Sequence, residues 1–520
     1  MFAPSDVTAP CGTVHGLLEG GVHVFRGIPY AAPPVGDLRF APPQPAPAVD
    51  NIDATRFGAI SAQDLDPLPA VKPGTEFNYY SAGARTDEDC LSLNVWTADP
   101  AGKAPVYVFI HGGAWLCGSG TGDWASGANQ ARDNGIVVVT INYRLGLLGG
   151  LWLGDHDPLA SNLAIQDMTQ ALRWVRDNIA SFGGDPAQVT IGGESAGAMS
   201  CIALLCAPDA RGLFQRAVVE SGHADFFLPV ESARAATRAV LERLFIDPDA
   251  DDVLARLRAL SPLRIAAVQR EFEAEQPLRT IPMVKDDVIL DGDPLRAIAE
   301  GCARDVDLLI GNTREENKLF TTIAGQWTSR SVADASASLL TDADARTWAT
   351  DAYTALAESE HLEPYSLDHA MTTEHGWAEP VRTTALAHAG SGGRTYHFEF
   401  SWGSSVPGVG SAHLIELPFF CGNLDATGVA DLLGEEVRTD PETVALGKNV
   451  ADTVAEFVRT GDLSSSALGA WPVFTEGARS TMVIDRTSRV ATDHLGERLD
   501  FWQSQRGSSA RPMSVVEVSE

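Results

Sequence analysis

The stretch VTIGGESAGAMS, residues 189–200, decides the predicted fold. It begins with a short apolar run, 189–191, and continues through the glycine-rich turn GESAG, 193–197, into a helical stretch, 198–207. A serine at such a strand-to-helix turn is lifted from the sheet edge, and the helix N-terminus points free N–H groups at the reacting oxygen. The order strand, turn, helix predicts Ser195 as a nucleophile. For the motif alone, a structural glycine turn is the alternative.

Short apolar runs recur along the chain and are typical of strands buried on both faces. They lie at 106–110, 136–142, 189–191, 217–219, 306–310 and 396–400. Amphipathic stretches separate them, the clearest at 167–179, where apolar residues return every three or four positions. This alternation predicts an α/β fold with a central, mostly parallel sheet and helices on both faces.

The pattern differs at the N-terminus and in two later regions. Residues 12–30 indicate short antiparallel strands around a Gly-Gly turn, and the Pro-rich stretch 29–47 cannot be regular sheet. Longer helical regions at 231–272 and 331–358 interrupt the strand rhythm. We expect them to form a helical cap over the C-terminal edge of the sheet, as insertions around 225–300 and 325–390. Since no linker divides the chain, residues 1–520 are predicted to form a single catalytic domain.

Composition and charge exclude several function classes. The 520 residues are 44% hydrophobic and 21% charged, and 69 acidic against 38 basic residues give a net charge of -31, which disfavours a nucleic-acid partner. The longest apolar stretches, such as 145–153, fall short of the roughly 18 residues of a membrane span. Neither HExxH, GxGxxG nor GxxxxGK occurs. We therefore expect no membrane span, no metal and no cofactor.

The cysteines and the first ten residues favour a cytoplasmic location. The seven cysteines are odd in number and contain no CxxC pair, and residues 1–10 lack the basic and apolar segments of a signal peptide. Cys201 and Cys206 lie five apart on one predicted helix, about 140° apart around its axis, and are poor mutual partners. We expect reduced thiols, Cys90 included, although spacing does not exclude a bridge among Cys11, Cys117, Cys302 and Cys421.

A second glycine-rich stretch, HGGAW at 111–115, follows the predicted strand 106–110. Small residues here let main-chain N–H groups approach a substrate oxygen, as in the oxyanion loop that accompanies a serine nucleophile. We predict that Gly113, Ala114 and Ala196 supply an oxyanion hole. A glycine turn without function is the alternative.

Four longer blocks carry a family resemblance that extends over nearly the whole chain. They are FRGIPYA at 25–31, EDCLSLNV at 88–95, NYRLG at 142–146 and FGGDP at 182–186. In this order they resemble the type-B carboxylesterases, which include cholinesterases and bacterial p-nitrobenzyl esterases. The resemblance implies the α/β-hydrolase fold and hydrolysis of carboxylic esters through a covalent acyl-serine intermediate.

The resemblance also implies the acid of a catalytic triad. The family places a glutamate in a motif similar to G-x-T-x-x-E-G, and this chain has GNTREEN at 311–317 directly after the apolar run 306–310. The match assigns the acid to Glu316 and excludes its neighbour Glu315. Asn317 departs from the glycine of the motif. Without the resemblance, a solvated acidic pair is the alternative.

Several histidines downstream of Glu316 could be the base. His397 lies inside an alternating strand, whereas His413 follows a Gly- and Ser-rich loop and precedes LIELPFF, 414–420, which resembles the segment after the family's catalytic histidine. The resemblance therefore assigns the base to His413. The other candidates are His361, His369, His375, His388 and His494.

Two further residues draw attention beside the triad. Ser221 matches a second serine that the family places near its acid, and we expect it to orient Glu316, with a structural turn serine as the alternative. Glu194 precedes the nucleophile, and the sequence assigns it no role.

The sequence thus predicts a serine carboxylesterase that acts on a small-molecule ester. The same triad acting on carbamates or amides stays open, because only the leaving group differs. A non-catalytic adhesion relative is the alternative from another class, and the presence of Ser195, Glu316 and His413 argues against it. The sequence leaves the oligomeric state open between monomer and homodimer.

Overall fold

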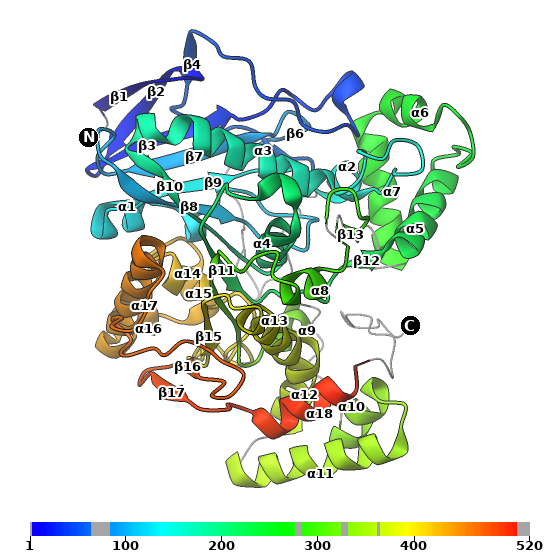
Figure 1. Cartoon of the computed structure of the whole chain (residues 1–520), viewed down its shortest axis with the longest axis vertical. Helices are drawn as coiled ribbons and strands as arrows, with labels where there is room; N and C mark the ends of the chain where they lie inside the picture. The colour runs from blue at the N-terminus through cyan, green and yellow to red at the C-terminus, as the bar shows by residue number, and fades with distance from the viewer. Residues whose placement is uncertain are drawn as a thin grey trace.

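The computed structural model describes residues 3–63, 84–275, 283–290, 292–323, 331–360 and 364–506, and within them a 13-stranded sheet forms the centre (Figure 1). Its strands are β1 (Ala3–Ala9), β2 (Gly12–Glu19), β3 (Val22–Pro29), β4 (Asn51–Asp53), β7 (Ser92–Thr97), β8 (Ala104–Ile110), β9 (Val137–Ile141), β10 (Gly184–Glu194), β11 (Arg216–Glu220), β14 (Asp307–Thr313), β15 (Thr395–Phe400), β16 (Thr481–Ile484) and β17 (Arg489–Ala491). Small separate pairs join β5 (Ile60–Ser61) to β6 (Thr86–Asp87) and β12 (Leu228–Pro229) to β13 (Val284–Lys285).

The sheet is parallel in its middle and antiparallel at its edges. The strands follow the order β1-β2-β3-β7-β9-β8-β10-β11-β14-β15-β16-β17, with β4 paired to β2. From β9 to β16 all neighbours run parallel. In this order β1, β2, β3 and β7 at one edge and β17 at the other are antiparallel to their neighbours, while the short β4 runs parallel to β2. The predicted mostly parallel sheet and its antiparallel N-terminal edge are confirmed.

Helices connect the strands and cover both faces of the sheet. The α-helices are α1 (Ala128–Asn134), α2 (Gly146–Gly150), α3 (Leu163–Asn178), α4 (Ala196–Cys206), α5 (Val230–Arg243), α6 (Val253–Ala259), α7 (Pro262–Glu275), α8 (Pro294–Ala299), α9 (Asn317–Ile323), α10 (Val332–Leu339), α11 (Ala343–Glu360), α12 (Pro364–Thr373), α13 (Glu379–Gly390), α14 (Leu417–Phe420), α15 (Val429–Leu433), α16 (Glu436–Thr439), α17 (Pro441–Thr460) and α18 (Gly496–Ser504). A π-helix, η5 (Glu374–Ala378), joins α12 to α13.

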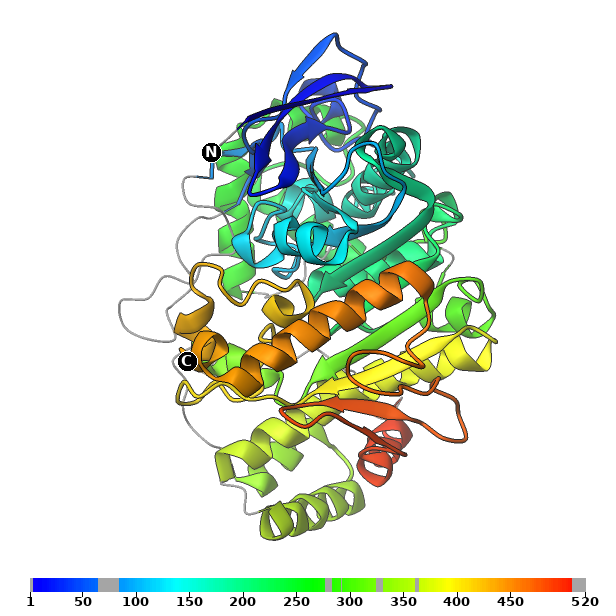
Figure 2. The ribbon, with the colours of Figure 1, turned by 90° about the vertical axis from the view of Figure 1, so that its left-hand side faces the viewer.

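Strand β8 illustrates why the strand sequences are apolar throughout. Val106, Val108 and Ile110 belong to the core that α3 and α4 cover, whereas Tyr107 and Phe109 belong to the core under α14 and α17. Figure 2 shows α17 lying across one face of the sheet. Because successive side chains point to opposite faces, a strand covered on both sides needs apolar residues at every position.

The two helical regions predicted as a cap each divide into shorter helices. The first, 231–272, contains α5, α6 and α7, and the second, 331–358, contains α10 and α11. The second divides at Asp342, whose Oδ1 accepts a hydrogen bond from the N–H of Ala345 and so begins a new helix. The assignment of these regions as caps on a single domain stays a prediction.

Strand β7 is the clearest central strand that the apolar pattern missed. All six of its residues are buried, yet Ser92, Asn94 and Thr97 are polar. The Nδ2 of Asn94 donates to the carbonyl of Gly120 and to Oγ1 of Thr140, which satisfies a polar group inside the core. Such hydrogen bonds are invisible in a count of apolar residues.

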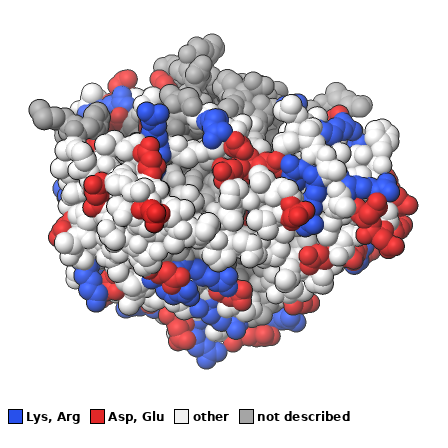
Figure 3. Space-filling model, turned by 90° about the horizontal axis from the view of Figure 1, so that it is seen from above, with Lys and Arg blue, Asp and Glu red and all other residues white. Residues whose placement is uncertain are grey.

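On the face that Figure 3 displays, acidic and basic side chains are interspersed among uncharged areas. The excess of acidic residues forms no single dominant acidic patch on this face. Among the described residues, no helix is both long and apolar enough to cross a bilayer. The same residues contain no group of three or more His, Cys, Asp or Glu side chains arranged to hold a metal ion.

Candidate active site

The predicted site residues come together at one edge of the sheet. Each follows the carboxyl end of one of five adjacent strands, β8, β10, β11, β14 and β15, and this is the edge where parallel α/β sheets bind their ligands. In strand order these residues are Gly113, Ser195, Ser221, Glu316 and His413.

Ser195 occupies a sharp turn between β10 and α4. Its φ of 56° and ψ of -123° are unusual for a residue with a side chain, and its N–H donates to the carbonyl of Glu220 on β11 at 2.9 Å. The turn depends on the glycine two positions later, because a Cβ on Gly197 would lie 2.0 Å from the carbonyl oxygen of Ile110. The backbone thus holds a strained serine at the strand end.

The oxyanion loop after β8 has three successive residues with positive φ. These are Gly113 at 102°, Ala114 at 55° and Trp115 at 57°. Within the described part of the chain, the N–H groups of Gly113 and Ala114 have no hydrogen-bond acceptor. Ala196 is the first residue of α4, where the N–H has no partner inside the helix. Three donors are therefore available near Ser195.

His413 and Glu316 form a short, buried pair. His413 Nδ1 lies 2.5 Å from Glu316 Oε2. The other oxygen of Glu316 accepts from the N–H of Thr313 at 2.7 Å and from Ser221 Oγ at 2.6 Å. These contacts fix the carboxylate, which in turn fixes the imidazole ring.

The other nitrogen of His413 faces a residue to which the sequence assigned no role. Nε2 lies 3.0 Å from Oε1 of Glu194 in an ion-pair contact that is not aligned as a hydrogen bond. Among the described residues, no hydrogen bond joins Ser195 Oγ to His413. Catalytic hydrogen bonds are often long or misaligned without substrate, so the lack of this bond is compatible with His413 as the base.

The two carboxylates control the charge of the imidazole. Burial by itself would lower the pKa of His413, but Glu194 and Glu316 outweigh it and raise this pKa well above the usual histidine value. Burial also raises the pKa of Glu194, and the nearby His413 partly offsets this increase. The resting site therefore favours a protonated imidazole held between two acidic groups.

Two more buried glutamates surround this pair. Burial, with neighbouring carboxylates adding to it, raises the pKa values of Glu220 and Glu416 well above normal and so shifts both groups toward their protonated forms. Ser221 Oγ lies 3.1 Å from Oε1 of Glu416. Because the single hydroxyl proton of Ser221 goes to Glu316, a protonated Glu416 can donate in turn to Ser221. The sequence missed Glu416, although it lies in the quoted segment after His413.

Glu315 lies outside this cluster and holds the histidine loop instead. Its N–H donates to the carbonyl of Ser411 at 2.9 Å, and its Oε2 accepts from the N–H of Ser411 at 2.9 Å. Lys318 Nζ forms an ion pair with Oε1 at 2.6 Å. The two neighbouring carboxylates therefore have different contacts, Glu315 with Ser411 and Glu316 with His413.

Comparison with known proteins identifies the family. The profile of the carboxylesterase family matches residues 3–502. This chain belongs to the carboxylesterase family. The family, fold and enzyme class predicted from the sequence are confirmed, and the protein is a serine hydrolase that acts on carboxylic esters.

Relatives of this carboxylesterase match it along nearly the full length. The para-nitrobenzyl esterase of Bacillus subtilis (strain 168) is 37% identical over 499 residues, covering 95% of this chain and 97% of the relative. The phenmedipham hydrolase of Pseudarthrobacter oxydans is 34% identical over 508 residues, covering 93% and 95%. A solved PNB esterase superposes with a TM-score of 0.83 at 33% identity, covering 96% of this chain and 99% of that one.

Aromatic rings adjoin His413 in this carboxylesterase, and no sequence pattern indicated them. Trp377 from η5 and Phe320 from α9 have ring centroids 4.9 and 5.1 Å from that of His413. Trp377 Nε1 also donates to Oδ1 of Asn317, next to the candidate acid, at 3.2 Å. These residues adjoin the site only through the tertiary fold.

The other candidate histidines of the carboxylesterase have partners elsewhere, and His361 lies outside the described residues. His388 contacts Thr395 and the carbonyl of Ala303, His397 contacts Thr481, His494 pairs with Glu399, His369 approaches Thr321, and His375 packs on Trp502.

Proposed function

We propose that Ser195, His413 and Glu316 are the nucleophile, base and acid of this carboxylesterase, with the N–H groups of Gly113, Ala114 and Ala196 as its oxyanion hole. The observation that carries the proposal is the 2.5 Å contact between His413 and Glu316 at the strand ends beside the strained Ser195 turn. Ser221 is proposed to orient Glu316 through its 2.6 Å hydrogen bond.

The chemistry proceeds by acyl transfer. Nε2 of neutral His413 accepts the proton of Ser195 Oγ, which attacks the ester carbonyl carbon, and the carbonyl oxygen becomes an anion held by the three N–H groups. The C–O bond to the alcohol then breaks, and the alcohol leaves with the proton from His413. Water attacks the acyl-serine by the same route and releases the acid. Glu316 stabilises the imidazolium in both halves.

Glu194 gives this proposal a consequence for pH. His413 can accept a proton only when it is neutral, while Glu194 and Glu316 favour its protonated form. Turnover is therefore expected to rise with pH through the raised pKa of His413. For Nε2 of His413 to accept the proton of Ser195, it must also give up its contact with Glu194.

The test combines turnover with covalent labelling. Ser195→Ala should lose activity toward p-nitrophenyl butyrate by on the order of a million-fold. Mass spectrometry should find one alkyl fluorophosphonate adduct, on the peptide that contains Ser195, in the wild type and none in the variant. Ser465→Ala, which changes an exposed serine, is the matched control and should behave as wild type. More than a few per cent of activity in Ser195→Ala, or labelling at another serine, contradicts the proposal.

The substrate class is proposed as small carboxylic esters, with carbamates or amides as the alternative. A relative named phenmedipham hydrolase makes phenmedipham a reasonable member of the substrate panel. Esters with graded acyl chains, measured beside an amide and a carbamate of the same acyl or alcohol group, separate the alternatives by kcat/KM. An amide preferred over its matched ester contradicts the ester proposal.

We also propose one domain over residues 1–520, with caps around 225–300 and 325–390, and a cytoplasmic location with neither nucleic-acid partner nor cofactor. The odd number of cysteines and the lack of a CxxC pair support this location. Cell fractionation with an antibody against the chain tests the location.

A further inference from the structure

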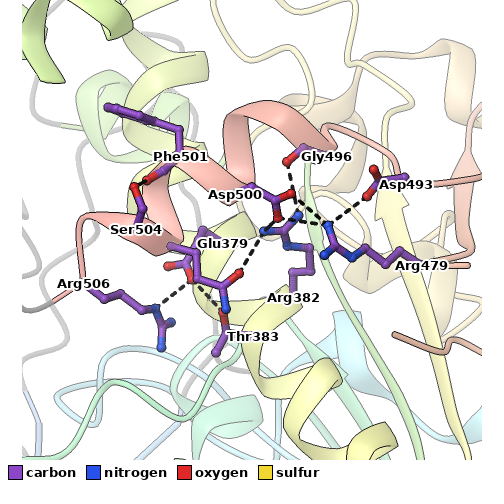
Figure 4. Close-up of polar contacts among 11 residues, drawn as sticks. Glu379, Arg382, Thr383, Arg479, Asp493, Gly496, Asp500, Phe501, Ser504 and Arg506 are labelled. Atoms are coloured by element: carbon purple, nitrogen blue, oxygen red, sulfur yellow. Dashed lines mark hydrogen bonds and ion pairs between the residues drawn. The ribbon is translucent and has the colours of Figure 1, made fainter. Parts of the chain in front are cut away.

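The C-terminal helix α18 packs against the part of the fold that adjoins the active site. It contacts η5 and α13, which continue from α12 as one long helical run. Trp502 of α18 is fully buried, and its Nε1 donates to the hydroxyl of Tyr353 at 2.8 Å. Figure 4 shows the charged side chains that join α18 to α13.

The π-helix η5 carries Trp377, whose ring adjoins His413. A π-helical turn is rare and is frequently found at functional sites. Here it brings Trp377 within 4.9 Å of the base and lets its Nε1 reach Asn317. The position of η5 therefore determines one wall of the active site.

Two arginines from the C-terminal segment pair with carboxylates at the two ends of η5. Arg498 Nε lies 2.9 Å from Oε2 of Glu374, the first residue of η5. Arg506 Nε lies 2.7 Å from Oε1 of Glu379, which directly follows η5 and is fully buried (Figure 4). Because a buried carboxylate without a partner is costly, these pairs fix the two ends of η5 to α18 and to Arg506, which follows it.

Arg506 also reaches a second wall of the site. Its Nη2 lies 2.6 Å from Oδ2 of Asp225, in the loop that follows Ser221. The next residue, Phe226, stacks on Trp115 of the oxyanion loop with ring centroids 5.6 Å apart. One guanidinium thus joins the loop that carries Phe226 to the helix that carries Trp377.

The rings between these walls form a continuous arc from the base to the oxyanion loop. Neighbouring centroids are 6.2 Å apart for Phe320 and Trp377, 6.0 Å for Trp377 and His223, and 6.4 Å for His223 and Phe226. Such spacings are typical of interacting aromatic side chains. The arc presents aromatic side chains in succession from His413 to the loop that carries Trp115.

We propose that Arg506 is a positioning residue that sets the spacing of this arc and thereby the preference for esters that carry an aromatic ring. The inference rests on the proposed function, since it takes Ser195 and His413 as the reacting groups. Arg506 touches neither of them, and it acts through Glu379 on the Trp377 wall and through Asp225 on the Phe226 wall.

The test compares esters with and without a ring in matched variants. Ethyl butyrate has no ring, while ethyl phenylacetate and benzyl butyrate carry one on the acyl and the alcohol side. In Arg506→Ala, KM for at least one ring-bearing ester should rise about fivefold, with kcat and the kinetics of ethyl butyrate nearly unchanged. Arg506→Lys should recover part of the loss, because a lysine can pair with one of the two carboxylates.

Arg479→Ala is the matched control. Arg479 pairs with Asp493 and Asp500, so it also fastens α18, but it contacts neither Glu379 nor Asp225. This variant should lower the melting temperature while keeping the wild-type preference between the esters. If Arg479→Ala changes the preference as much as Arg506→Ala does, or if Arg506→Ala affects all three esters equally, the inference is overturned.

Asp225→Asn keeps the test decisive if Arg506→Ala does not fold. It weakens only the contact with the Phe226 loop and leaves the buried pair of Arg506 with Glu379 intact. It should shift the ester preference in the same direction by a smaller factor, and an unchanged preference overturns the inference. A wild-type enzyme that hydrolyses ethyl butyrate and loses this activity in Ser195→Ala supports the proposed function whatever these variants do.

Discussion

The nucleophile turn and the histidine loop reach the same point in the structure by different means. Ser195 lies inside a contiguous stretch whose strand, turn and helix are all local, and Gly197 allows its close contact with β8. His413 follows an irregular loop, and its partner Glu316 is 97 residues away. One half of the site is built by neighbours in sequence and the other by neighbours in space.

This difference teaches where each half is vulnerable. The turn depends on the absence of a side chain at one position, so adding a single methyl group disrupts it. The histidine loop depends on charges, with Glu316 and Glu194 on the ring and Glu315 on the backbone of Ser411. Changes of charge should therefore affect this half far more than the nucleophile turn.

Among the changes that compare the two halves, the largest effect is expected from the proposed acid. Glu316→Gln should lower kcat on the order of ten-thousand-fold, since an amide cannot stabilise the imidazolium or fix its tautomer. Glu315→Gln keeps an oxygen for the N–H of Ser411 and should change kcat only modestly. Steady-state kinetics of both variants check the assignment. If Glu315→Gln showed the large loss and Glu316→Gln the small one, the motif would be assigned one residue out of register.

The turn is tested by Gly197→Ala. A Cβ here would lie 2.0 Å from the carbonyl oxygen of Ile110, so β8 or α4 must move, and kcat/KM should fall by about a hundredfold. Gly390→Ala is the control, because a Cβ at this position of α13 meets nothing within 4 Å. Equal activity in the two variants would show that the turn tolerates a side chain.

The pH dependence is tested by Glu194→Gln. Removing this carboxylate should lower the pKa of His413, so the acidic limb of kcat/KM should move to lower pH. The stabilisation from the protonated His413 is present below its unfolded pKa and is lost as pH rises through the raised folded pKa. The variant should therefore also lose less stability at alkaline pH than wild type, as denaturant titrations would measure. An unmoved limb would mean that Glu194 does not act on the base.

The smallest effect is expected from the thiols. Denatured, unreduced protein should titrate seven thiols, and a reductant should leave the activity unchanged. On mild oxidation with hydrogen peroxide, Cys206 and Cys302 should be the pair that forms a disulfide and releases two waters, because their sulfurs are 3.9 Å apart. Peptide mapping checks the pair. Activity lost on gentle reduction of untreated protein would contradict the expectation of free thiols and the proposed location.

The sequence also failed in instructive places. The apolar pattern did not predict β7, because this buried strand contains polar residues. Asn94 is tolerated there since its side chain donates hydrogen bonds to residues that are distant in sequence. The Cys206 and Cys302 contact could not be found from spacing. Both features depend on contacts between residues that are distant in sequence, and the local spacing of apolar residues does not report such contacts.

By itself, the sequence determined the parallel strands and the strand, turn and helix around Ser195, whereas its choice of Glu316 over Glu315 as the acid stays a prediction. These features follow from backbone conformation and from burial on both faces, which depend on residues close together in the chain. Only the tertiary structure decided that Glu194 and Trp377 contact His413 and that Arg506 pairs with both Glu379 and Asp225. A contact between distant residues, and the charge it stabilises, depends on how the strand ends and helices pack, and no short segment of sequence records that packing.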